Sequence, residues 1–269
     1  MYIAQFKLNS HGDGLMQISI IMGLFILGTI LGSFYNVVAY RLPKGESIVF
    51  PGSHCPKCKH KLQFWELIPV ISFILQRGKC SKCKSKISIF YPLSEIMCGL
   101  LFVFCYLAFG ISFDLIIALT FISMLIIVIL SDIYYMIIED SVLIVFTVLL
   151  SIEILLIHGY EILLSSILSG VISFVIMYLL KLFGDFLFKK ESLGGGDIKL
   201  MFPIGLMIGF DMSIITIFLS AFIALPISLF ILKNKKNHEI PYGPFLSIAA
   251  MIIYFTHLDF NMIINFLTK

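Results

Sequence analysis

The chain is organised around a glycine run that ends in an acid, Leu193-Gly194-Gly195-Gly196-Asp197-Ile198-Lys199. Successive glycines let the backbone approach another segment closely, or adopt dihedral angles closed to other residues. The run lies at the edge of an apolar segment, where ionisation is unfavourable, so an acid there is interpreted as functional. A second acid, Asp132, follows the apolar residues 121–131 in a similar setting. We therefore expect the fold to bring Asp132 and Asp197 together at a membrane surface.

The composition predicts an all-α polytopic membrane protein. The 269 residues are 59% hydrophobic and 13% charged, whereas a soluble domain is about a quarter charged. The mean hydropathy is +1.04. Apolar runs of about 18 or more residues are typical of membrane-crossing helices. We expect about eight transmembrane helices, near residues 15–40, 92–109, 115–131, 141–157, 162–183, 200–209, 212–232 and 243–254.

The sequence predicts three parts. Residues 1–40 hold an N-terminal segment and the first transmembrane helix. Residues 41–91 form a small cytoplasmic loop domain with four cysteines. Residues 92–269 form a membrane-embedded domain that carries both acids.

The loop domain contains two CxxC pairs, Cys55-Pro56-Lys57-Cys58 and Cys80-Ser81-Lys82-Cys83. Two such pairs at this spacing supply four thiolates for a tetrahedral ion, and a sulfur-only set favours Zn²⁺. Because four cysteines leave no position for water, the zinc is expected to be structural. Two redox pairs or disulfides are the alternative, which a cytoplasmic loop disfavours.

The distribution of basic residues predicts the orientation. Of the 19 Lys and Arg residues, all but two lie in 41–91, 181–199 and 233–236. The predicted spans put these three segments on one side, and the positive-inside rule makes that side cytoplasmic. Asp132, Asp140 and Asp197 all reach this face. We therefore expect a multi-pass protein of the cytoplasmic membrane with its active site facing the cytoplasm.

The two acids predict aspartic peptidase chemistry. Two carboxylates that share a site cannot both ionise easily, so the pair holds a proton. One member can then act as a base on water while the other acts as an acid. A structural alternative is that Asp132 and Asp140 only end helices, with Asp140 capping the span that begins at Ser141.

Three further residues are expected to support the site. Lys199 is placed to offset the charge of Asp197 or to meet a lipid headgroup. Glu95 lies near the inner end of the second span, where it either reaches the interface or holds a substrate amine. Asp140 lies on the same face as the two acids.

Motifs along most of the chain resemble those of the bacterial type IV prepilin peptidases, a family of GxGD aspartic peptidases. The matching segments are Gly32-Ser33-Phe34-Tyr35-Asn36-Val37-Val38, Arg41-Leu42-Pro43, both CxxC pairs, Tyr91-Pro92-Leu93-x-Glu95, Gly194-Gly195-Gly196-Asp197-Ile198-Lys199-Leu200 and Pro241-x-Gly243-Pro244-Phe245. One departure concerns the family pattern of an aspartate, six residues and Pro-Asp, because Glu139 stands here in place of the proline.

The resemblance implies two activities. The first is cleavage of a short basic leader from prepilins or pseudopilins, with Asp132 and Asp197 catalytic and Gly194, Gly196, Lys199, Asp140 and Glu95 supporting. The second is methylation of the new N-terminus with S-adenosylmethionine. No glycine-rich Rossmann pattern is present to bind that donor. The expected partners are the prepilin substrate and the lipid bilayer, with no nucleic acid.

Other functions remain open from the residues alone. A transporter could use the same two acids to relay protons or cations, although we find no internal repeat to support it. A zinc-bearing membrane scaffold without catalysis is a third hypothesis.

Overall fold

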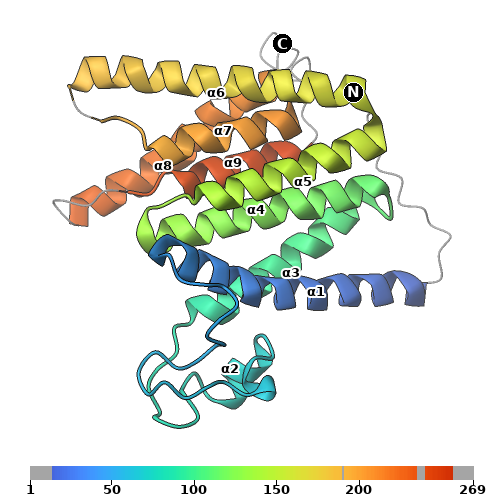
Figure 1. Ribbon diagram of the computed structural model, residues 1–269, viewed down its shortest axis with the longest axis vertical. Coiled ribbons are helices and arrows are strands. Elements are labelled where there is room, and N and C mark those ends of the chain that lie inside the picture. Colours follow the sequence, from blue (N-terminus) through green and yellow to red (C-terminus); the bar gives the residue numbers. More distant parts are fainter. Residues whose placement is uncertain (1–13, 190, 235–239, 257–269) are drawn as a thin grey trace. The chain divides into compact units, whose positions relative to one another are not determined.

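The computed structural model describes residues 14–189, 191–234 and 240–256. Within these ranges the chain forms nine α-helices, two short 3-10 helices and no β-strand, which confirms the all-α prediction. The α-helices are α1 (Gly14–Arg41), α2 (Ile71–Leu75), α3 (Phe90–Phe109), α4 (Phe113–Tyr135), α5 (Asp140–His158), α6 (Tyr160–Phe188), α7 (Gly195–Ile208), α8 (Phe210–Asn234) and α9 (Gly243–Thr256) (Figure 1).

Six of the described helices are long and apolar enough to cross a membrane, namely α1, α3, α4, α5, α6 and α8. The other two expected spans correspond to α7 and α9, which have 14 residues each. At about 1.5 Å per residue, 14 residues rise about 21 Å, less than the ~30 Å hydrocarbon core of a bilayer. The expected number of eight spans is therefore not confirmed.

The chain divides into two compact units that adjoin in the sequence at Leu115 and Ile116. We call Ala4–Leu115 the N-terminal unit and Ile116–Lys269 the C-terminal unit. The first holds α1, the cysteine loop and α3, and the second holds almost all of α4 and the helices that follow. The three-part division at residues 40 and 91 stays a prediction.

Small residues let α1 and α3 pack closely in the N-terminal unit. A Cβ atom on Gly28 would lie 2.7 Å from the Cα of Gly99, and one on Gly32 would lie 2.9 Å from the Cβ of Cys98. This is the small-xxx-small contact of membrane helices, in which missing side chains allow the backbones to touch. Asn36 adds a polar link, since its Nδ2 donates to Ser94 Oγ at 2.8 Å.

Close contacts also join α6 and α7 in the C-terminal unit. A Cβ on Gly170 of α6 would lie 2.8 Å from the carbonyl oxygen of Phe202, and one on Gly205 of α7 would lie 2.8 Å from that of Ser169. The end of α4, the start of α7 and the start of α9 lie at one end of this unit, at the left of Figure 1. This end of the unit carries the candidate acids.

The connection from α6 to α7 folds back along α6 before α7 begins. The amide of Ser192 donates to Asp185 Oδ1 at 2.7 Å, and its hydroxyl donates to the carbonyl oxygen of Lys181 at 3.2 Å. Residue 192 is therefore level with the turn that starts at Lys181, seven residues before α6 ends at Phe188. As a result, α6 extends past the start of α7 (Figure 1).

The α1–α3 contact predicts a position-dependent effect of one added methyl group. We expect Gly28→Ala to destabilise the protein by ~1–3 kcal/mol, because the methyl group would meet the α3 backbone. Gly23→Ala is the matched control, since a Cβ at Gly23 meets nothing within 4 Å. It should be neutral or slightly stabilising, as alanine favours helix. Thermal unfolding of both variants in detergent, followed by circular dichroism, checks this. Equal shifts in the midpoint would contradict it.

Candidate active site and metal centre

Asp132 lies in the last turn of α4 and is held by the first turn of α9. Its side chain is buried, and Oδ2 accepts a hydrogen bond of 2.9 Å from the amide of Gly243. Gly243 is the first residue of α9, so its amide has no partner within that helix. The partial positive charge of a helix N-terminus also favours a nearby carboxylate. The start of α9 is therefore a built-in partner for Asp132.

Asp197 is held in the same way by the start of α7. It is the third residue of this helix, and Gly194 is the N-cap. The carboxylate of Asp197 accepts the backbone N–H of Gly194, which satisfies one of the free amides at the start of the helix. Its side chain is buried as well. Both candidate acids are thus buried carboxylates beside the N-terminus of a short helix, Asp132 beside that of α9 and Asp197 within that of α7.

Ile138, in the connection after α4, lies between the starts of α7 and α9. A Cβ on Gly196 would lie 2.8 Å from the Cβ of Ile138, and one on Gly243 would lie 3.0 Å from its Cδ1. The same atom on Gly243 would lie 2.7 Å from Asp132 Oδ2. The two helix starts therefore meet beside one side chain, close enough for the charge of Asp132 to act on Asp197. The geometry brings two buried carboxylates together beside Ile138.

The three glycines of the run are not equivalent. A Cβ on Gly194 would lie 3.0 Å from Asp197 Oδ2, and Gly196 is closed by Ile138. A Cβ on Gly195 meets nothing within 4 Å. The first and third glycines are therefore needed for close approach, whereas the middle position is open to a side chain.

Lys199 bonds to Asp140, a pairing that the sequence did not suggest, and the capping role considered for Asp140 was wrong. Lys199 Nζ lies 2.8 Å and 2.6 Å from the two carboxylate oxygens of Asp140. Asp140 is the first residue of α5, and the N-cap position belongs to Glu139. Since both side chains are about half exposed, we assign the pair a modest energetic role in joining α5 to α7.

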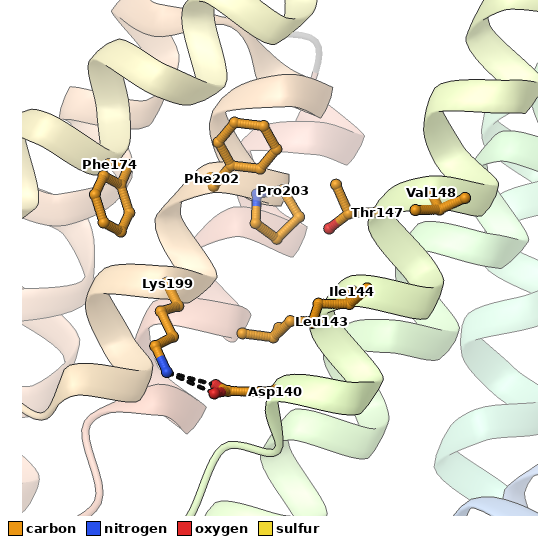
Figure 2. Close-up of a pocket in the computed structure, with 9 residues that line it drawn as sticks. All are labelled: Asp140, Leu143, Ile144, Thr147, Val148, Phe174, Lys199, Phe202 and Pro203. Carbon is orange, nitrogen blue, oxygen red and sulfur yellow. Dashed lines mark hydrogen bonds and ion pairs between the residues drawn. The ribbon is translucent and has the colours of Figure 1, made fainter.

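The Lys199–Asp140 pair closes one end of an apolar groove of about 490 Å³. Figure 2 shows α5, α6 and α7 contributing its walls. The remaining lining residues are Leu143, Ile144, Thr147, Val148, Phe174, Phe202 and Pro203.

Glu95 has a structural contact in the N-terminal unit. It is buried in α3, and Oε2 accepts a hydrogen bond of 2.8 Å from the amide of Val70. Ser33 of α1 also bonds to this carboxylate. Val70 has a φ of 61°, which is unusual for a β-branched residue. Glu95 therefore fixes the start of α2 against α1 and α3.

The four loop cysteines form a cluster that could hold a metal ion. Their sulfur atoms all lie within 4.8 Å of one another, and the Cys55–Cys83 and Cys58–Cys80 Sγ pairs are 3.8 Å and 3.9 Å apart. Four sulfurs at 2.3 Å from a tetrahedral ion would be about 3.8 Å apart. The spacing therefore fits a four-thiolate metal centre.

The two CxxC pairs are built alike. In each, the residue directly after the second cysteine donates its amide back to the carbonyl of the first cysteine: Lys59 to Cys55 at 2.9 Å and Lys84 to Cys80 at 3.0 Å. Both lysines have a positive φ, 58° and 59°. The backbone amide of Cys58 lowers the pKa of Cys55 to about 6, and the hydroxyl of Ser85 lowers the pKa of Cys83. These bonds favour the thiolate form of Cys55 and Cys83, whereas burial and the neighbouring sulfur atoms raise the pKa of Cys58 to about 11.

Glu66 links the two pairs, a role that the sequence did not suggest. This buried carboxylate accepts from the amide of Gln63 at 2.9 Å and contacts His60 Nε2 at 3.1 Å. Bonds from Ser81, Gln63 and His60 lower the pKa of Glu66. Because His60 follows the first pair and Ser81 lies within the second, one carboxylate braces both halves of the cluster.

Comparisons with known proteins agree with this geometry. Residues 26–109 match the bacterial peptidase A24 N-terminal domain, and residues 119–229 match the type IV leader peptidase family. The chain is 36% identical to the prepilin leader peptidase/N-methyltransferase of Bacillus subtilis, over 91% of this chain and 97% of the relative. The chain belongs to the type IV leader peptidase family. A relative of the same name in Neisseria gonorrhoeae is 31% identical over 85% of this chain and 88% of its own.

Membership of the type IV leader peptidase family confirms the resemblance drawn from the motifs. It gives no support to the transporter hypothesis. No solved structure matches the chain significantly.

The four-cysteine cluster predicts that replacing a cysteine within it removes the metal, whereas replacing a cysteine outside it does not. We expect purified wild-type protein to carry about one metal ion per chain, and Cys55→Ser to lose most of it because three thiolates bind less tightly. Cys105→Ser is the control, since Cys105 lies buried in α3 outside the cluster. Elemental analysis of both proteins measures this. Unchanged metal in Cys55→Ser would refute the four-thiolate centre.

Proposed function

We propose that the chain cleaves the short basic leader from prepilins or pseudopilins and then methylates the new N-terminal residue. The observation that carries the peptidase proposal is the pair of buried acids, Asp132 and Asp197, at the starts of α9 and α7 beside Ile138. The names of the relatives support the substrate and the second activity.

The proposed cleavage needs a water molecule between the two carboxyl groups. One carboxylate takes a proton from this water, whose oxygen attacks the scissile carbonyl carbon, while the other carboxyl donates its proton to the carbonyl oxygen. Collapse of the resulting diol breaks the C–N bond: the first acid gives its proton to the leaving amine, while a hydroxyl of the diol becomes the new carbonyl and returns its proton to the second carboxylate. Both carboxyls are thereby restored, and no covalent intermediate forms.

Burial of the acids suits this reaction. Helix N-termini hold both carboxylates in fixed positions, so little reorganisation is needed when charge develops. Apolar helices around them keep bulk water low, which strengthens electrostatic interactions inside the site. The charge distribution of the sequence supports a cytoplasmic-membrane protein with this site on the cytoplasmic side.

The proposed metal is a structural zinc ion. Cys55, Cys58, Cys80 and Cys83 would all be used as ligands, which leaves no position for a reactive water. The zinc would hold the loop between α1 and α3 and take no part in peptide cleavage.

For methylation, S-adenosylmethionine would supply the methyl group. A role for Glu95 near the substrate amine stays a prediction, and its bond to Val70 supports a positioning role. Gly194, Gly196, Asp140 and Lys199 are proposed to support the site by packing α7 and joining it to α5.

Replacing either acid tests the peptidase proposal. We expect Asp132→Asn and Asp197→Asn each to reduce leader cleavage on the order of 10⁴-fold or more, because members of one catalytic unit are lost together. The matched control is Asp211→Asn, an exposed acid in the first turn of α8. Mass spectrometry of a prepilin-like substrate in reconstituted membranes measures shortening, and an added methyl group in the same spectrum measures the second activity. Normal cleavage by both active-site variants would refute the proposal.

A second prediction concerns the amide that holds Asp132. In Gly243→Ala, the new methyl group would lie against Asp132 Oδ2, and the carboxylate must move. We expect cleavage to fall about 10²-fold, the effect of a displacement near 1 Å in a catalytic group. Gly195→Ala should keep near-normal activity, because that position is open. The same cleavage assay compares them, and equal losses would contradict the assigned geometry.

A further inference from the structure

The cysteine loop exposes a run of large apolar side chains between its 3-10 helix at Phe64–Glu66 and the end of α2. We call residues 64–75 the apolar segment. Phe64 is 81% exposed, Trp65 63% and Leu75 76%, and Leu67, Ile71 and Ile74 are exposed as well. Exposing this much apolar surface to water is unfavourable, so such a patch is typical of a surface that meets a membrane or another protein.

The depth of the apolar segment favours a membrane. Its Val70 amide bonds to Glu95, which is the sixth residue of α3 and therefore about 7.5 Å along that helix. Glu95 also bonds to Ser33, eight residues before α1 ends at Arg41, or about 12 Å back along α1. The start of α2 thus lies beside the membrane-crossing part of the α1–α3 pair.

The charge of the loop favours an anionic surface. Residues 45–89 carry eight basic side chains, and all of them are exposed: Lys57, Lys59, Lys61, Arg77, Lys79, Lys82, Lys84 and Lys86. Of the two acids in the same range, Glu46 is exposed and Glu66 is buried. Arg77 and Lys79 directly follow the apolar segment. Basic residues next to an apolar surface meet the headgroups of anionic lipids while the apolar groups enter the acyl region.

We propose that the apolar segment inserts into the headgroup–acyl boundary of an anionic phospholipid bilayer, with Trp65 at the interface. The loop is then held to the membrane surface by this contact as well as by its two flanking helices. Tryptophan is enriched at that boundary because its ring is apolar and its N–H can bond to water or headgroups. This proposal is independent of the peptidase activity.

Trp65 is the only tryptophan in the chain, so fluorescence excited at a wavelength that tyrosine does not absorb reports on this segment alone. The full-length protein would be reconstituted in bilayers containing phosphatidylglycerol and lipids brominated on the acyl chains. We expect brominated lipid to quench Trp65 strongly, and shallow bromines more than deep ones, while aqueous acrylamide quenches weakly. Strong acrylamide quenching without lipid quenching would overturn the proposal. Shielding from both quenchers would also overturn it, because the cover would then be protein, either from this chain or a second copy.

Two variants separate the apolar and the charge contributions. In Ile74→Ser/Leu75→Ser, lipid quenching of Trp65 should fall several-fold, with unchanged metal content showing that the loop is folded. In Arg77→Gln/Lys79→Gln, lipid quenching should fall in anionic bilayers and approach the value seen in phosphatidylcholine. Lys189→Gln, an exposed lysine after α6, is the control and should change nothing. Equal quenching of wild type in both bilayers would refute the role of anionic headgroups.

Discussion

A carboxylate inside an apolar helix bundle must find hydrogen-bond donors in the protein, because bulk water is scarce there. Asp132 and Asp197 each take an amide from the beginning of a helix, from Gly243 and from Gly194. Close approach explains why both donors are glycines, since a Cβ at either position would press on the bound carboxylate. The arrangement of α4, α7 and α9 follows from the need to bring these groups together.

Much of this site could be predicted from the sequence, but its connections could not. An acid at the edge of an apolar run stands out in the local sequence, so Asp132 and Asp197 could be chosen as candidates. The donor to Asp132 lies 111 residues further along the chain, and no local pattern links the two. Ile138 looks like one more apolar residue until the fold places it between two helix starts. Likewise, Lys199 and Asp140 are 59 residues apart, which hid their pairing.

The cysteine loop shows the same division between local and long-range information. Metal-binding cysteines obey a short spacing rule, so the cluster was evident from two CxxC pairs. The contacts from Glu66 to both CxxC pairs form only in the folded loop, and no sequence motif indicates them. The expected number of spans is not confirmed, for a physical reason. Apolar composition persists through α7 and α9, but in the described part each is too short to cross a full bilayer.

The folded-back connection between α6 and α7 has a consequence for what can reach the acids. Ser192, three residues before α7 begins, lies level with the turn that starts at Lys181, so the remaining seven residues of α6 rise about 10 Å above that level. A peptide that reaches Asp197 near the start of α7 would have this part of α6 along one side. Passing it takes about three residues of extended chain.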